Sequence, residues 1–271
     1  MLIEAFVRRV NLTGLSAAAK SLRTRMFRRR IYFAHIPKSG GTSLSHMMRA
    51  RYPVSYFKLD EDASREACPG AAGEWMRFKS RMASYHAALG RNFVQAHAPV
   101  TRMMLDRFAD EYQFVTILRD PVDRALSSYF FDPRLRAMTP EAFVKSERFS
   151  IEANVLGHFF GELDWDGGGD ANRAVARAIE NLERFDVVGL LEYDEDLSRQ
   201  FREKIGFQVR LPKRNVGSNR TDNDIEAWLR GPLTEACAHD YRIYNHFAAR
   251  VAAPSVDGGA NAGLVGSGAG S

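Results

Sequence analysis

Short apolar runs alternate with amphipathic segments along most of the chain. Runs rich in β-branched and aromatic residues, bounded by turn formers, are typical of buried strands; they cover residues 31–36, 92–96, 113–118 and 185–191. Helical spacing of apolar residues occurs between and beyond these runs, over residues 42–49, 100–111, 122–131, 172–184 and 194–205. Strands that alternate with helices predict an α/β fold of three layers, with a mostly parallel sheet flanked by helices.

The pattern changes at both ends of the chain. Residues 1–30 form a basic amphipathic leader, in which a break is expected at Asn11–Gly14. Residues 252–271 are rich in Gly, Ala and Ser and predict a flexible tail. We therefore expect one folded domain over residues 31–251. Within it, residues 60–80 are polar and irregular and predict an excursion from the core.

Charge is distributed unevenly between the leader and the remaining residues. The formal net charge is +5, but residues 1–30 alone carry +7, whereas the rest of the chain carries −2. The basic character therefore does not indicate that the domain binds nucleic acid. A basic amphipathic helix could lie on an anionic membrane. A helix packed on the domain, or a mitochondrial-type presequence, would explain the same pattern.

The cysteines and the hydropathy bear on the compartment. Cys68 and Cys237 are far apart in the sequence and form no C-x-x-C pair, which fits a reducing compartment. No apolar run approaches the ~20 residues that cross a bilayer. We expect a cytoplasmic protein, with peripheral contact between the leader and the inner membrane left open. No cluster of histidine and cysteine indicates a metal site.

The first chemical motif is the segment that follows the first strand, His35-Ile-Pro-Lys-Ser-Gly-Gly-Thr-Ser43. Glycines let backbone N–H groups converge on an anion, and the helix that follows begins with unpaired N–H groups. The lysine precedes both glycines, whereas a Walker A loop places it after the last one. The alternative is a tight turn capped by Thr42 or Ser43. The residues expected to bind phosphate are Pro37, Lys38, Ser39, Gly40, Gly41, Thr42 and Ser43.

The second motif follows the third strand, Leu118-Arg-Asp-Pro-Val-Asp-Arg-Ala-Leu-Ser-Ser-Tyr129. Pro121 suits the first turn of a helix. Arg119 would then stand at the carboxyl end of a parallel strand, where α/β folds bind ligands. An arginine fork and the hydroxyl of Ser127 could grip a second phosphate. Spacing alone equally allows a surface ion pair made by Arg119 or Arg124 with a neighbouring aspartate.

Together the two segments resemble the cofactor-binding loops of sulfotransferases that use 3′-phosphoadenosine 5′-phosphosulfate (PAPS). The likeness is closest to the carbohydrate-type family of heparan sulfate 2-O-sulfotransferases and bacterial family 2 relatives, which have a P-loop-like fold. The family patterns H-[IV]-P-K-[ST]-G-[GS]-T-[ST] and L-R-[DN]-P-x-[ED]-R-x-x-S-x-[YF] match residues 35–43 and 118–129. The resemblance implies that the first loop binds the 5′-phosphosulfate and that Arg119 and Ser127 bind the 3′-phosphate. It extends more weakly over about residues 31–250.

The resemblance also implies catalytic roles. Lys38 would stabilise the departing phosphate, and His97, at the end of the second strand, would take the proton of the acceptor hydroxyl. Relatives often carry a base histidine in this segment, sometimes as H-x-H, but here Gln95 stands in place of the first histidine. Lys213 and Arg220 lie in a segment similar to the family's late loop, and would clamp the cofactor phosphates or an anionic glycan. No metal is implied.

We therefore expect a PAPS-dependent sulfotransferase that transfers a sulfuryl group in line to a hydroxyl of a carbohydrate or glycolipid. Two other classes stay open: a P-loop-type phosphotransferase that uses ATP and Mg²⁺, and a non-catalytic module that binds adenosine phosphates or glycans. Golgi members of the family carry a transmembrane anchor, so the absence of an apolar span favours a bacterial cytoplasmic enzyme.

Overall fold

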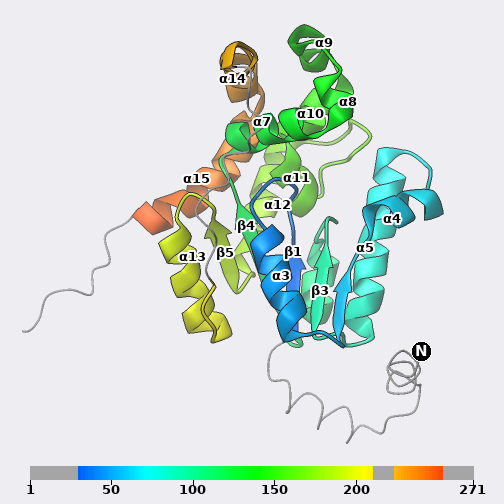
Figure 1. Ribbon diagram of the computed structural model, residues 1–271, viewed down its shortest axis with the longest axis vertical. Helices are drawn as coiled ribbons and strands as arrows, with labels where there is room; N and C mark the ends of the chain where they lie inside the picture. The colour runs from blue at the N-terminus through cyan, green and yellow to red at the C-terminus, as the bar shows by residue number, and fades with distance from the viewer. Residues whose placement is uncertain (1–29, 210–222, 253–271) are drawn as a thin grey trace, which may run out of the picture.

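The computed structural model describes residues 30–209 and 223–252 of the chain (Figure 1). Its sheet has five strands in the order β2-β3-β1-β4-β5, and every adjacent pair is parallel. The strands are β1 (Arg30–Ala34), β2 (Tyr56–Lys58), β3 (Phe93–Ala96), β4 (Tyr112–Leu118) and β5 (Val187–Leu190). With helices on both faces, this arrangement confirms the predicted α/β fold.

Helices follow the strands and cover both faces and one end of the sheet (Figure 1). Those of the first half are α3 (Thr42–Arg51), α4 (Glu61–Ala67), α5 (Ala72–Ala88), α6 (Arg102–Phe108), α7 (Pro121–Phe131) and α8 (Pro133–Arg136). The others are α9 (Pro140–Val144), α10 (Glu147–Ala153), α11 (Val155–Phe160), α12 (Ala171–Glu183), α13 (Asp194–Gln200), the π-helix η1 (Phe201–Ile205), α14 (Asn223–Ala236) and α15 (Ala238–Ala252).

Alternation along the strands divides the core into two layers. Ile31 and Phe33 of β1 pack with residues of α3, α13 and η1 on one face of the sheet. Tyr32 and Ala34 pack on the other face with residues of α5, α6, α11, α12 and α15. Because successive side chains of a strand point to opposite faces, a residue two positions beyond Phe33 continues toward α3.

A third apolar cluster joins helices beyond the carboxyl ends of the strands, where α7, α8, α9, α10 and α14 lie together at the top of Figure 1. Arg124 of α7 is buried there and donates to the carboxylate of Glu152 on α10 across 2.9 Å. Arg148 reaches the same carboxylate at 2.7 Å. This ion pair fastens α7, the helix that follows the second motif, to its neighbours.

The prediction of an irregular excursion over residues 60–80 is wrong. These residues form α4 and the first half of α5, and Asp60 caps α4 by accepting from the N–H of Ala63. Lys79 occupies an inward position of α5 with 1% exposure, where it pairs with Glu61 at 2.9 Å. The buried lysine interrupts the apolar pattern by which a helix is recognised.

Other differences lie at the borders of elements. The short edge strand β2 has no apolar run long enough to predict it. The predicted helix over residues 194–205 ends in a π-helix, and the first strand ends at Ala34 instead of Ile36. Among the helices in the described ranges, none is long and apolar enough to span a bilayer. The leader up to residue 29, and the tail from residue 253, lie outside the described residues.

Candidate active site

The two motifs meet where the direction of the chain's connections reverses. The connection after β1 leads toward β2 at one edge of the sheet, and the connection after β4 leads toward β5 at the other. β1 and β4 are neighbours, with Ala34 opposite Thr116. In open α/β sheets, ligands bind at the carboxyl ends of strands at such a switch point. The loop after β1 and the turn after β4 are the walls of this site.

Two residues of the loop after β1 have a left-handed backbone conformation. Lys38 has φ of 68° and Gly40 has φ of 77°. A Cβ on Gly40 would stand 2.5 Å from Leu191, and one on Gly41 would stand 2.4 Å from Nε2 of His35. A left-handed backbone at a non-glycine residue costs on the order of 1 kcal/mol. Such strain at Lys38, beside glycines with no room for a side chain, indicates a loop shaped for binding.

The helix after this loop leaves its first N–H groups unoccupied by a capping side chain. The N-cap residue of α3 is Gly41, so the alternative of a cap made by Thr42 or Ser43 is wrong. Ser39 is fully buried, and its hydroxyl has no hydrogen-bond partner among the described residues. Uncapped N–H groups and an orphaned buried hydroxyl suit an anion.

Arg119 connects the two motifs directly. Its Nη1 donates to the backbone carbonyl of Lys38 across 3.0 Å. The ammonium of Lys38 lies 3.4 Å from the ring centroid of Phe131, at the end of α7. Partial burial, and then the charge of Arg119, lower the pKa of Lys38. Two cations therefore stand at the carboxyl edge of β1 and β4.

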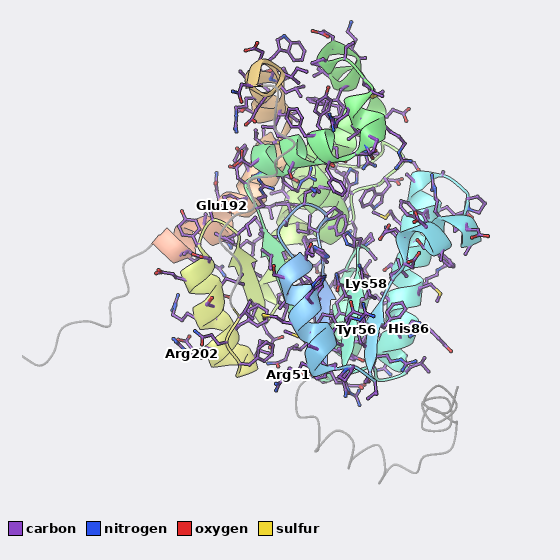
Figure 2. The ribbon with its side chains drawn as sticks, in the orientation of Figure 1. Arg51, Tyr56, Lys58, His86, Glu192 and Arg202 are labelled. Atoms are coloured by element: carbon purple, nitrogen blue, oxygen red, sulfur yellow. The ribbon has the colours of Figure 1, made fainter. Side chains whose placement is uncertain are left out.

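The turn that carries Arg119 is held from several sides. Asp120 caps α7 by accepting from the N–H of Asp123, and Pro121 begins the helix as predicted. The N–H of Asp120 donates to Glu192, which follows β5 and is labelled in Figure 2. Tyr241 and Tyr244 of α15 donate to Asp120 and Glu192 at 3.0 Å and 2.9 Å.

These hydrogen bonds from tyrosines were not found from the sequence, because a tyrosine in an amphipathic helix gives no sign of its distant partner.

The other residues of the second motif lie on α7. Ser127 is half-buried there, six residues beyond Pro121. Arg124 makes the buried pair with Glu152 in place of the surface pair weighed above, and Asp123 pairs with Arg230 at 3.0 Å.

His97 lies beside the loop after β1. Ala34 and Ala96 are opposite one another in β1 and β3, and the rings of His35 and His97, one residue further, have centroids 4.3 Å apart. His35 stacks in turn on Phe33 at 4.9 Å. His46, on the first helix, is exposed.

Burial and nearby positive charge keep the histidines neutral. Burial, followed by the charge of Lys58, lowers the pKa of His35 to about 4. The pKa of His97 falls well below 6.5, through burial first and then through His35, Lys79 and Lys58. A neutral imidazole can accept a proton at physiological pH, so His97 has the protonation state that a general base requires.

In place of the first histidine of the H-x-H pattern, Gln95 takes part in a buried hydrogen-bond network. Gln95 is fully buried on β3, and its amide lies 2.8 Å from Nδ1 of His35 and 3.3 Å from the hydroxyl of Tyr56. Tyr56 and Lys58, on the edge strand β2, lie near one another in Figure 2. Both residues escaped sequence reasoning, because β2 itself was not predicted.

Two further predicted contacts, Lys213 and Arg220, lie outside the described residues. In the described ranges 30–209 and 223–252, no group of three or more histidine, cysteine or acidic side chains could hold a metal ion.

Comparison with known proteins bears on the first half of the chain. Residues 26–148 match the family model described as "Sulfotransferase family". This match covers slightly less than half of the 271 residues and contains both motifs and His97. No curated protein matches the chain. Over residues 26–148 the family match confirms the resemblance drawn from the two motifs, and it supports sulfuryl transfer as the general chemistry.

Proposed function

We propose that the protein transfers a sulfuryl group from PAPS to a hydroxyl of an acceptor. The observation that carries the proposal is the hydrogen bond from Arg119 to the carbonyl of Lys38. It brings the two phosphate motifs together at the switch point of the sheet. A donor with a phosphosulfate at one end and a 3′-phosphate at the other needs two anion sites a short distance apart, and the two motifs offer them.

Residues of the loop after β1 would hold the 5′ end of the donor. Backbone N–H groups of the glycine turn and the start of α3, with the hydroxyls of Ser39, Thr42 and Ser43, would donate to its oxygens. Arg119 and Ser127 would hold the 3′-phosphate, and Lys213 and Arg220 would cover the bound donor. Bound PAPS supplies an activated sulfuryl group whose leaving group is a phosphate.

Two residues would act on the transfer itself. The ammonium of Lys38 would neutralise negative charge that develops on the departing phosphate. His97 would accept the proton of the attacking hydroxyl at one ring nitrogen, since its lowered pKa leaves it neutral. The loop and the strand ends would keep the nucleophile and the leaving group in line.

The acceptor is proposed to be a carbohydrate or glycolipid hydroxyl. The segments at 52–90 and 132–170, where we expect the acceptor pocket, are largely helical. We propose a cytoplasmic location, with residues 1–30 making peripheral contact with the inner membrane.

A comparison of ligands in thermal unfolding tests the proposal. Adenosine 3′,5′-bisphosphate should raise the unfolding temperature, whereas ATP with Mg²⁺ should not, because binding only to the folded state stabilises it. Lys38→Ala should abolish the shift, and Lys145→Ala, at an exposed lysine of the same chain, should retain it. Stabilisation by ATP with Mg²⁺ alone would instead support a phosphotransferase. Binding of the bisphosphate and of PAPS without transfer to any acceptor in a broad panel would support a binding module.

A further inference from the structure

The amide of Gln95 lies between two aromatic side chains, those of Tyr56 on β2 and of His35, which directly follows β1. Lys58 of β2 and Phe33 of β1 are its register partners, so Gln95 stands on the central part of the sheet with its side chain toward the α3 face. Its oxygen, Oε1, accepts from the hydroxyl of Tyr56 at 3.3 Å. Its nitrogen, Nε2, lies 2.8 Å from Nδ1 of His35. Both ends of the fully buried amide are therefore occupied.

This arrangement fixes the proton on the His35 ring. An amide nitrogen has only donors, so Nδ1 of His35 must accept the hydrogen bond. A neutral imidazole that accepts at Nδ1 carries its single proton at Nε2. Burial and the charges of Lys58 and Lys79 around the histidine pair oppose a second proton. His35 is thereby held as the neutral Nε2–H tautomer.

The tautomer matters because of where Nε2 lies. The edge of the ring formed by Nε2 and Cδ2 lies against Gly41, since a Cβ there would stand 2.4 Å and 2.5 Å from these atoms. Gly41 is the N-cap residue of α3, where the unpaired N–H groups of the phosphate loop begin. The Nε2–H group is thus an uncharged donor at the loop. The lone pair of Nδ1 of His35 accepts from the amide, and Nε2 already carries the proton. The ring of His97, tilted by 50° with its centroid 4.3 Å away, has no such amide bond among the described residues.

We propose that Gln95, oriented by Tyr56, is a positioning residue that holds His35 as the Nε2–H tautomer and so leaves proton acceptance to His97 alone. That His97 alone accepts the proton rests on the proposed function, whereas the tautomer of His35 does not. A histidine at position 95 would supply a second proton acceptor. Gln95 instead prevents the neighbouring His35 from acting as one.

Histidine-selective ¹⁵N NMR of the full chain measures the tautomer without turnover, and His35→Gln identifies the His35 signals. We expect an unprotonated Nδ1 and a protonated Nε2 that stay unchanged from pH 8 to pH 6. Tyr56→Phe removes the hydroxyl that orients the amide, so an Nδ1–H population should appear. Tyr85→Phe, at an exposed tyrosine of α5, is the control and should leave the tautomer unchanged. Nδ1–H in the wild-type protein, or no change in Tyr56→Phe, would overturn the proposal.

Gln95→Glu converts the donor at His35 into an acceptor and is the sharper variant. It should move the proton to Nδ1 and raise the pKa of His35, so that the ring becomes charged nearer neutral pH. Turnover should then fall at least tenfold and its acid limb should move to higher pH, while binding of adenosine 3′,5′-bisphosphate persists. Gln95→Leu keeps much of the volume without the charge and should give mixed tautomers if Gln95→Glu does not fold. Unaltered His35 signals in whichever variant folds would contradict the proposal. A correct tautomer in a protein that binds no bisphosphate would instead count against the proposed function.

Discussion

Arg119 donates from Nη1 to the backbone carbonyl of Lys38 across 3.0 Å and so joins the turn after β4 to the loop after β1. The accepting carbonyl belongs to a residue whose backbone is left-handed, with φ of 68° at Lys38, and the bond places a guanidinium at the carboxyl edge of β1 and β4. A guanidinium is a planar group with five N–H donors, which suits it to bind a phosphate.

Arg119 should discriminate between nucleotides by their 3′-phosphate. We expect Arg119→Ala to weaken binding of adenosine 3′,5′-bisphosphate by about 10- to 100-fold, the usual worth of a charge-assisted pair, and to leave binding of AMP nearly unchanged. Arg119→Lys should recover only part of the loss, since lysine lacks the planar fork. Calorimetric titration of both ligands measures this.

The control for this prediction is Arg107→Ala, which removes an exposed arginine of α6. Equal losses for AMP and for the bisphosphate would mean that Arg119 acts only by bracing the loop at Lys38, and would contradict direct contact with the 3′-phosphate.

The ring of Phe131 should compete with the phosphate of the sulfuryl donor for the ammonium of Lys38. The ring is 68% exposed, and the ammonium lies over it at 3.4 Å. A cation–π contact of this kind is worth about 0.5–2 kcal/mol, and it must loosen when the ammonium turns to a phosphate. We expect Phe131→Leu to tighten bisphosphate binding by up to about tenfold, and Phe131→Tyr to leave it unchanged. Weaker binding in Phe131→Leu would show that the ring supports the bound state instead.

The acid limb of turnover should reflect the environment of His97. Because burial and neighbouring charges lower its pKa well below 6.5, the imidazole stays neutral and competent as pH falls to 6.5. The rate should therefore hold level there and fall only at lower pH. His97→Asn should reduce turnover by about 100-fold or more.

Lys58→Gln supplies an internal check on this electrostatic argument. Lys58 is exposed at the end of β2, so the substitution should be tolerated, and the loss of its charge should move the acid limb to higher pH. The role of these charges would be contradicted if the turnover rate of the wild-type protein already fell at pH 6.5. It would also be contradicted if Lys58→Gln did not change the pH at which the rate falls.

The sequence allowed the positions of the loop after β1 and the turn after β4 to be predicted because each is a local pattern. The glycine loop lies between one strand and the next helix, and the position of Arg119 follows from the strand that precedes it. Residues that act across the fold could not be predicted in this way. Gln95 contacts Tyr56 and His35 only because β2, β3 and β1 are neighbours, and β2 has three residues, too few for a periodic signal. Tyr241 reaches Asp120 from a helix more than 100 residues later.

Buried charged side chains are the second reason why parts of the fold could not be predicted from the sequence. Lys79 and Arg124 are almost fully buried, and each is compensated by a glutamate on another helix. A charged residue in a sequence normally indicates an exposed position, so both helices had inward positions that looked like outward ones. The compensating partners are set by tertiary packing and have no fixed spacing in the chain.

Asp240 should make stability fall as pH rises. It is 1% exposed on α15 and accepts from the N–H groups of Leu156 and Gly157 at 2.8 Å and 3.1 Å. Burial raises its pKa in the folded protein to about 7, against 3.8 as its ordinary value. The folded state therefore binds more protons than the unfolded state between these values, and the stabilisation present at low pH is lost as pH rises toward 7. Asp240→Asn resembles the protonated acid but does not ionise. In urea unfolding from pH 4.5 to pH 8, the free energy of unfolding of the wild-type protein should decline relative to that of Asp240→Asn, by at most about 1.4 kcal/mol per pH unit. A constant difference between the two proteins across this range would show that Asp240 is ionised in the fold throughout.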